Sequence, residues 1–347
     1  MVPTKEWEDA YLHSLLKEID LRIPLFLNRR IVSLYLGGGT PFLLQPKRIQ
    51  AILDHLPPLQ NDCEITLEAN PESTTKDLLI EYRQTGINRL SLGVQSFNDH
   101  ELKILGRSHR SKDVYRVIDE AISADFSNIS IDLMYELVSQ TLTFWEHSLL
   151  SACRLPLHHI SLYNLVVEPN SVWHRKEKAI RIEQPEDEVA LEMYKMAIEK
   201  TAAHGFTQYE ISAFARAGAI SKHNVGYWKG REFLGFGPSA FSFFDGKRFS
   251  NYSNLKKYCS ALEREELAID FVDETSDRLR EMIAVGLRMT EGVVFSEAEA
   301  AWGKGDADLK DTLAKLTSWG LITNHNGILM LTDQGRVLYD SIASEII

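Results

Sequence analysis

The chain has few cysteines and no long hydrophobic run. Its 347 residues include only three cysteines, Cys63, Cys153 and Cys259, which lie far apart in the sequence. This spacing excludes the framework of a small disulfide-rich protein. No apolar stretch approaches the ~18 residues of a membrane-spanning helix, and no segment typical of a signal peptide opens the chain. We therefore expect a cytoplasmic protein with reduced thiols and no membrane span.

Basic side chains are also in short supply. The sequence has 38 lysines and arginines and 49 aspartates and glutamates, which gives a formal net charge of −11. Because phosphate contacts require a basic surface, this balance disfavours a nucleic-acid-binding protein. A hydrophobic fraction of 44% and a charged fraction of 25% fit a globular protein of about two domains.

Apolar runs alternate with amphipathic segments of helical spacing, a pattern that predicts parallel β-α-β units. The sequence thus favours an open or partial α/β barrel. One helical segment, "EWEDAYLHSLLKEID", precedes the first apolar run, although a parallel unit normally starts on a strand. The predicted strands cover residues 31–36, 64–67, 89–94, 128–133 and 159–163.

Each predicted strand ends in polar or glycine residues. The first runs into "GGGTP", and the next four end near Glu68, Gln95, Asp132 and Tyr163. Ligands of parallel α/β folds gather at the C-terminal ends of the strands, and glycines let a ligand approach the backbone closely. Any one of these residues could simply form a turn or cap a helix. Together they predict one ligand above the sheet.

Eight segments in a fixed order carry a specific resemblance. The chain resembles the radical S-adenosylmethionine proteins related to oxygen-independent coproporphyrinogen III oxidase, and within them the heme-chaperone branch. The similarity runs from Trp7 to the C-terminus. The segments are "LGGGTP", "EITLEANPES", "GINRLSLGVQSFNDHELKILGRSH", "SIDLMYEL", "HISLYNLVVEPNS", "YEISAFARAG", "HNVGYW" and "FLGFGPSAFS".

The resemblance implies a division into three parts. Residues 1–215 would form a partial (β/α)6 radical-SAM barrel without its first strand. Residues 216–270 would form a connector that carries the HNxxYW motif. Residues 271–347 would form a small winged-helix-like α+β domain, for which the sequence itself predicts short helices and two brief strands joined at Asn326 and Gly327. The lack of a basic recognition helix there again disfavours nucleic acid.

The resemblance also implies a site for S-adenosylmethionine. Carboxylates can accept hydrogen bonds from ribose hydroxyls and an ammonium group, and an arginine fork suits a carboxylate. Before the resemblance is counted, Arg107 could equally be a surface arginine at a helix end. The implied residues are Gly38, Gly39 and Thr40 for the methionyl part, with Glu68, Gln95, Arg107 and Asp132 around the rest.

Two features depart from the family pattern. Relatives carry CxxxCxxC, whose thiolates hold a 4Fe-4S cluster, but this sequence has no such motif, and we do not expect its scattered cysteines to replace it. Either a short N-terminal segment is missing, which we favour, or the cluster was lost naturally. In both cases the chain as given should lack radical chemistry and leave an open strand edge that favours association, for example as a homodimer. In the second departure, Glu136 to Ser139 replace a Gly-Leu-Pro-Gly turn.

The HNxxYW motif reads His223, Asn224, Tyr227 and Trp228, and the resemblance associates it with heme. An imidazole can ligate heme iron, and aromatic rings can cover a porphyrin face, although a core histidine among aromatics remains the alternative. We expect a heme chaperone that transfers heme to an acceptor protein. Two other functions stay open: an oxidase that decarboxylates porphyrinogen propionates, and a cluster-free scaffold. The rival heme ligands are His109, His158 and His159.

Overall fold

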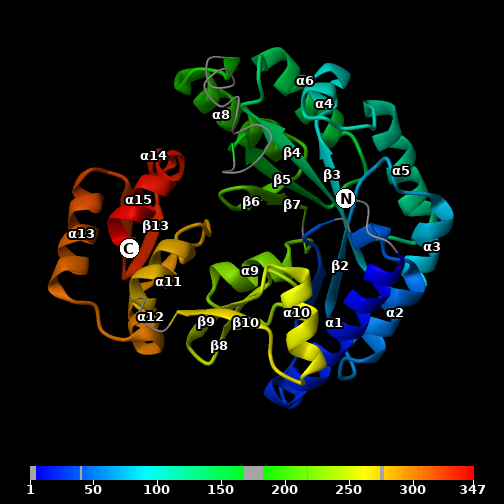
Figure 1. The fold of residues 1–347 in the computed structure, drawn as a ribbon. Helices are drawn as coiled ribbons and strands as arrows, with labels where there is room; N and C mark the ends of the chain where they lie inside the picture. The colour runs from blue at the N-terminus through cyan, green and yellow to red at the C-terminus, as the bar shows by residue number, and fades with distance from the viewer. Residues whose placement is uncertain (1–4, 40, 168–182, 217, 274–276) are drawn as a thin grey trace.

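A seven-stranded sheet curled into a half barrel dominates the computed structural model, which describes residues 5–39, 41–167, 183–216, 218–273 and 277–347 (Figure 1). Its strand order is β1-β2-β3-β4-β5-β7-β6, and β1 to β5 are parallel. The five predicted strands are thereby confirmed. The strands are β1 (Ser33–Leu36), β2 (Glu64–Ala69), β3 (Arg89–Gln95), β4 (Ile129–Tyr135), β5 (His159–Asn164), β6 (Thr207–Glu210) and β7 (Ala213–Ala215).

Helices cover the outer face of the curled sheet (Figure 1). Strand β3 is buried along almost its whole length, as expected for a parallel strand with packing on both faces. The polar C-terminal ends of the strands therefore meet at one rim of the half barrel. The connecting elements are η1 (Pro41–Leu43), α2 (Pro46–Asp54), α3 (Lys76–Gln84), α4 (Asp99–Ile104), α5 (Ser111–Ser123), α6 (Leu142–Cys153) and α8 (Asp187–Ala203).

Strand β1 lies at the end of the sheet and pairs with β2. The backbone oxygen of Val32 accepts a hydrogen bond from the Glu64 amide at 3.1 Å. Because backbone groups alternate along a strand, those of Ser33 and Tyr35 point to the opposite, open edge. The open edge expected from the sequence is present in the described part of the chain.

The first helix, α1 (Lys5–Phe26), stands across from this open edge and packs beside α10 (Leu255–Glu263) (Figure 1). Its Glu18 and Arg22 form a fully buried ion pair of 2.9 Å. Glu18 also accepts hydrogen bonds from the Gly237 amide at 2.8 Å and the Tyr258 hydroxyl at 2.6 Å. These bonds hold α1 against the connector that follows the barrel, so that α1 is separate from β1.

The remaining chain forms the connector and a C-terminal part that lies across the open side of the half barrel (Figure 1). The connector contains α9 (Lys222–Trp228), β8 (Phe241–Phe244), β9 (Lys247–Asn251) and β10 (Ile269–Asp273). The C-terminal part contains α11 (Arg278–Gly286), β11 (Val293–Val294), α12 (Phe295–Trp302), α13 (Ala307–Ser318), β12 (Ile322–His325), β13 (Ile328–Leu331), α14 (Asp333–Val337) and α15 (Tyr339–Ile346).

Each of these parts has its own antiparallel sheet, ordered β10-β9-β8 and β11-β13-β12. Strands β12 and β13 are joined at Asn326 and Gly327, whose positive φ angles of 54° and 83° are typical of a tight hairpin turn. The predicted strand pair around these residues is therefore confirmed. None of the described helices is both long and apolar enough to cross a bilayer.

Candidate cofactor and ligand-binding site

The glycine loop after β1 lies against the carboxylate of Glu68. A Cβ atom on Gly37 would be 2.6 Å from the ring of Tyr35 and 3.0 Å from the carboxyl carbon of Glu68. Gly38 has a φ of 101°, which side chains rarely tolerate, and space is open around Gly38 and Gly39. The loop thus presents bare backbone beside a carboxylate. Thr40 lies outside the described residues.

Amide and guanidinium groups meet at the end of β3. The register of β3 against β4 shifts before Gln95, which has a positive φ of 69°. A Cβ atom on Gly93 would be 2.9 Å from Asn70 Oδ1, 3.3 Å from Gln95 Nε2 and 3.8 Å from an Arg107 nitrogen. Arg107 also donates to Asn70 at 3.0 Å. Glycine therefore keeps a polar cradle free, and Asn70 joins it although it was not singled out in the sequence.

Asp132 lies close to the same groups. Burial raises its pKa to about 7, and the nearby Glu68 carboxylate adds to the rise, whereas a hydrogen bond with Ser161 and the positive charges of Arg89 and Arg107 oppose it. Asp132 faces Ser161 across the β4 and β5 pair. The structure therefore brings together Glu68, Arg107 and Asp132, three of the residues that the resemblance implies for one site, and adds Ser161.

These groups fit S-adenosylmethionine, but the described cysteines do not fit a 4Fe-4S cluster. Two carboxylates, an arginine fork and bare glycine backbone match the ammonium, carboxylate and hydroxyl groups of the cofactor. Cys63 and Cys153 are buried, and burial raises their pKa to about 11, so that they are thiols rather than thiolate ligands. Cys259 is buried in a different hydrophobic cluster. Within the described ranges, no three His, Cys, Asp or Glu side chains gather as metal ligands.

The loop that departs from Gly-Leu-Pro-Gly retains a backbone suited to glycine. Glu136 and Ser139 stand at the two glycine positions, and each has a φ of 58°. The amide of Ser139 donates to the Glu183 oxygen at 2.7 Å, and the Gln184 side chain donates to the Glu136 oxygen at 3.2 Å. Hydrogen bonds thus hold a left-handed conformation that ordinary side chains adopt only at a cost.

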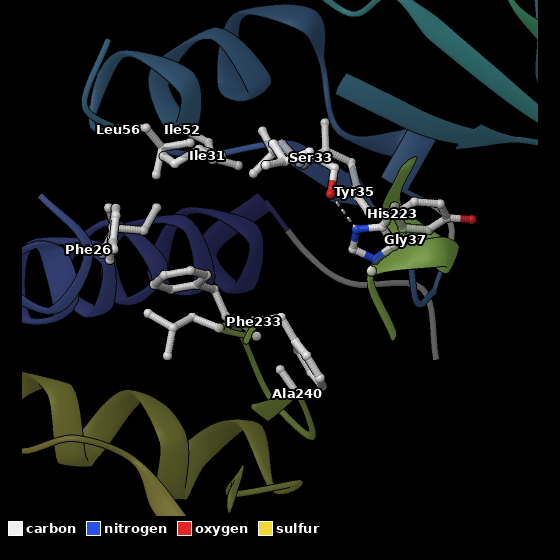
Figure 2. Close-up of a pocket in the computed structure, with 18 of the residues that line it drawn as sticks. Phe26, Ile31, Ser33, Tyr35, Gly37, Ile52, Leu56, His223, Phe233 and Ala240 are labelled. Carbon is white, nitrogen blue, oxygen red and sulfur yellow. Dashed lines mark hydrogen bonds between the residues drawn. The ribbon is translucent and has the colours of Figure 1, made fainter. Parts of the chain in front are cut away.

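A large cavity of ≈ 920 Å³ adjoins this rim along the open edge of β1. Its walls are α1, β1, α2, α9 and the segment from Arg231 to Phe244 (Figure 2). Most of the lining is apolar, and it is rich in aromatic rings. The aromatic residues are Tyr11, Phe26, Tyr35, Tyr227, Phe233, Phe236, Phe241 and Phe244.

The imidazole of His223 forms part of the cavity wall. Its Nδ1 atom is 3.2 Å from the Ser33 hydroxyl, its plane is stacked on the Tyr35 ring with centroids 4.7 Å apart, and the Tyr227 ring meets it edge-on at 4.8 Å. The Nε2 atom has no hydrogen-bond partner among the described residues, and Figure 2 shows it turned away from Ser33. One ring nitrogen is therefore fixed and the other is free.

A buried carboxylate fixes the helix that carries His223. The side chain of Glu64 accepts hydrogen bonds from the backbone amides of Lys222 at 3.2 Å and His223 at 3.1 Å, and Ser221 caps the helix through the Asn224 amide at 3.3 Å. Burial, together with the nearby positive charge of Arg231, lowers the pKa of His223 to about 4. At neutral pH the imidazole is uncharged, the form that ligates metals.

Tyr35 links the cavity to the rim of the sheet. Its ring stacks on His223, while its hydroxyl donates to Glu68 at 2.7 Å. Burial, reinforced by the neighbouring Glu68 carboxylate, raises the pKa of Tyr35 far above its usual value, so that the hydroxyl stays protonated. One side chain therefore contacts a member of each predicted site.

The structure does not bring Asn224 and Trp228 to the cavity. Neither lines it, because neighbouring residues on a helix point about 100° apart. Trp228 instead lies on the guanidinium of Arg288 at 4.5 Å, and Arg288 pairs with Glu210 at 3.2 Å. Trp228 thus contacts the C-terminal part of the chain. Of the two aromatic residues of the motif, only Tyr227 faces the cavity.

The rival histidines are already engaged. His109 lies within hydrogen-bond distance of the Glu72 carboxylate at 2.9 Å and the Val94 oxygen at 3.1 Å. His159 lies 2.8 Å from both the Ser130 and Tyr209 hydroxyls. His158 accepts a hydrogen bond from the backbone of residue 129 at 3.3 Å. Both ring nitrogens of His109 and His159 are occupied, so that neither is free to take iron.

Comparison with known proteins identifies two matching families along the chain. Residues 3–141 match the Radical SAM superfamily, and residues 275–338 match the HemN C-terminal domain. The heme chaperone HemW of Bacillus subtilis (strain 168) is 35% identical to this chain over 341 residues, which cover 96% of this chain and 90% of that protein.

Two further relatives span nearly the whole chain. The mitochondrial radical S-adenosyl methionine domain-containing protein 1 of Danio rerio is 32% identical, over 100% of this chain and 82% of that protein. The solved structure of coproporphyrinogen III oxidase (HemN) from Escherichia coli, a radical SAM enzyme, is 25% identical with a TM-score of 0.84, over 99% of this chain and 84% of that one.

Proposed function

Because this chain belongs to the family of the heme chaperone HemW within the radical SAM superfamily, we propose that it binds heme and transfers it to an acceptor protein. Heme would lie in the cavity beside β1, with its iron facing His223. The observation that carries this proposal is the free Nε2 atom of a neutral imidazole on the wall of an aromatic cavity of ≈ 920 Å³.

The residues around His223 support heme binding at this wall of the cavity. Iron needs a neutral imidazole, and the second nitrogen of a ligating histidine is usually held by a hydrogen bond, a role that Ser33 fills at 3.2 Å. Tyr227 and the phenylalanines of the lining supply apolar surface for a porphyrin face. Asn224 and Trp228 do not line the cavity and would contribute only indirectly, as part of the helix α9 that carries His223.

S-adenosylmethionine is the second ligand of the proposal. Membership of the superfamily implies this cofactor together with a 4Fe-4S cluster, which supplies the electron that cleaves it. Glu68, Arg107 and Asp132 would hold its polar groups, with the backbone of Gly38 and Gly39. The Asn70 and Gln95 amides would complete the cradle. The described residues bring no three cysteines together, so that the role of the cradle side chains in the proposal is to bind and orient the cofactor.

The alternative function is that of the structural relative from Escherichia coli, coproporphyrinogen III oxidase. Both functions place a tetrapyrrole near the rim of the sheet. They differ in what happens to the propionates, because the oxidase removes two of them as carbon dioxide and the chaperone returns the ligand unchanged.

A loading and transfer experiment tests the proposal. Hemin is titrated into the protein, and the loaded protein is then mixed with apomyoglobin as a spectroscopic acceptor. We expect a Soret band at about one hemin per chain, complete transfer to apomyoglobin and recovery of unchanged heme by mass spectrometry. Loss of carbon dioxide from coproporphyrinogen III under anaerobic conditions with S-adenosylmethionine would favour the oxidase instead.

Two further elements of the proposal concern where the protein acts and with what. We propose a cytoplasmic protein whose acceptor is another protein, and a homodimer that forms through the open edge of β1 only while the cavity is empty, because residues 31–36 of this edge line the cavity in which heme would lie. A strand edge with unpaired backbone groups favours pairing with another chain. Sedimentation velocity of the hemin-free protein should therefore reveal concentration-dependent association, and a strictly monomeric hemin-free protein would contradict the dimer.

A further inference from the structure

The cavity that contains His223 has a cationic wall. Its lining includes three arginines, Arg29, Arg30 and Arg231, and one glutamate, Glu232. With the imidazole of His223 neutral, the wall carries more positive than negative charge. An uncharged aromatic ligand would gain nothing from this excess, whereas a ligand with carboxylate groups would be attracted to it.

Two of the three arginines already have carboxylate partners. Arg29 pairs with Glu232 at 2.5 Å, and Arg30 pairs with Asp62. Arg231 instead donates to the backbone oxygen of Lys222 at 3.2 Å. No carboxylate among the described residues lies within ion-pair distance of its guanidinium, and the side chain is exposed.

The HNxxYW helix holds Arg231 in place. The backbone amide of Arg231 donates to the Gly226 oxygen at 2.8 Å. A Cβ atom on Gly226 would lie 3.0 Å from Arg231 Nη1 and 3.5 Å from its Cζ. Glycine at this position of the motif therefore lets the guanidinium lie directly against the helix, one turn from His223.

Arg231 and His223 also act at the same end of the cavity. The positive charge of Arg231 contributes, after burial, to the low pKa of His223, which requires the two groups to be near each other. A guanidinium presents several donors in a rigid fork that matches a carboxylate. Its present single bond to a backbone oxygen leaves donors free.

We propose that Arg231 recognises a carboxylate of the ligand, so that the cavity selects a macrocycle with acidic side chains, such as the propionates of heme, over an esterified one. Arg231 would bind the acidic group while His223 faces the metal. This inference rests on the proposed function and adds the residue that determines specificity for the acidic side chains.

The test compares hemin with hemin dimethyl ester, whose propionates are uncharged. We expect the unaltered protein to bind hemin about tenfold more tightly than the diester, which is ~1.4 kcal/mol. Arg231→Gln should remove this preference by weakening hemin binding about tenfold while leaving diester binding within about twofold. Arg264→Gln removes an arginine that pairs with Glu266 on the surface and should change neither affinity.

A second variant shifts Arg231 without removing it. In Gly226→Ala the new methyl group would displace the guanidinium, and alanine favours the helix, so that folding is not at risk. We expect the same loss of preference, but smaller. Equal weakening of hemin and diester by Arg231→Gln, or no change in either, would overturn the inference.

The experiment distinguishes a wrong role for Arg231 from a failure of the proposed heme-binding function. If hemin binds with a His223-dependent Soret band but Arg231→Gln has no effect, only the role of Arg231 is wrong. If neither porphyrin gives a His223-dependent band with the unaltered protein, heme binding at this site is itself wrong, and the inference falls with it.

Discussion

The ring of Tyr35 lies almost parallel to the imidazole of His223, with an angle of 19° and centroids 4.7 Å apart. The two residues are separated by most of the barrel in sequence, and the Tyr35 hydroxyl reaches on to Glu68 at 2.7 Å. Tyr35 therefore supports the proposed heme ligand with its ring and a proposed S-adenosylmethionine contact with its hydroxyl.

Two substitutions of Tyr35 should separate these roles. Tyr35→Leu removes the stacked ring and should weaken hemin binding about fivefold, since such aromatic contacts contribute ~1 kcal/mol. Tyr35→Phe keeps the ring and loses the hydrogen bond to Glu68, so that hemin binding should stay within about twofold while S-adenosylmethionine binding weakens. Hemin and cofactor titrations measure both. Equal damage to hemin binding by the two variants would contradict the separation.

The low pKa of His223 predicts a dependence of stability on pH. In the unfolded chain a histidine titrates near 6.5, but in the folded protein the value is about 4 because of burial and the charge of Arg231. Between these values only the unfolded state binds the proton. The contribution of neutral His223 is therefore present above pH 6.5 and is lost as the pH falls towards 4.

The comparison of the unaltered protein with His223→Gln isolates this effect, because glutamine can still bond to Ser33 but does not titrate. From pH 7.5 to pH 5.0, urea unfolding should show the unaltered protein losing up to about 2 kcal/mol more stability than the variant. Identical losses in the two proteins would mean that His223 is solvated and has an ordinary pKa.

The raised pKa of Asp132, about 7, predicts proton release when S-adenosylmethionine binds. The cofactor carries positive charge, which favours the ionised carboxylate. Its affinity should therefore increase from pH 6 to pH 8, and binding at pH 7 should release about half a proton. Calorimetry in two buffers of different ionisation enthalpy measures the release. Asp132→Asn should abolish it, and release that persists in this variant would assign the proton to another group.

The left-handed residues of the loop after β4 predict an increase in stability on substitution. Glu136→Gly and Ser139→Gly should each raise the free energy of unfolding by ~1 kcal/mol, because the present φ of 58° at each position is strained for a side chain and natural for glycine. Thermal unfolding checks this. Leu137→Gly is the control and should lower the free energy of unfolding, because Leu137 is buried. An unchanged or lower free energy of unfolding in Glu136→Gly and Ser139→Gly would refute the argument.

Much of the barrel can be predicted from the sequence, because parallel strands that are buried on both faces have nearly continuous apolar runs. The run from Arg89 to Val94 and the run from Asn128 to Leu133 predict β3 and β4 to within two residues. The polar residues at the strand ends predict the shared rim. The short antiparallel strands β6 and β7 were not predicted, since strands of three or four residues carry no clear periodicity.

The cavity could not be predicted because it depends on contacts distant in sequence. Nothing local to His223 indicates that Tyr35 stacks on it or that Glu64 fixes its helix. The HNxxYW motif also does not indicate which of its side chains point into the cavity. Tyr227 and Trp228 are adjacent in the sequence, yet one faces the cavity and the other lies on Arg288.

The central claim, that His223 ligates heme through its free nitrogen, is tested most directly by a hemin titration of three proteins. These are the unaltered chain, His223→Ala, and His109→Ala as a buried-histidine control. We predict binding of about one hemin per chain, an affinity at least tenfold lower in His223→Ala, which corresponds to ~1.4 kcal/mol, and a Soret band in His109→Ala like that of the unaltered chain. Equal affinity and an identical Soret band in the unaltered protein and His223→Ala would contradict the claim.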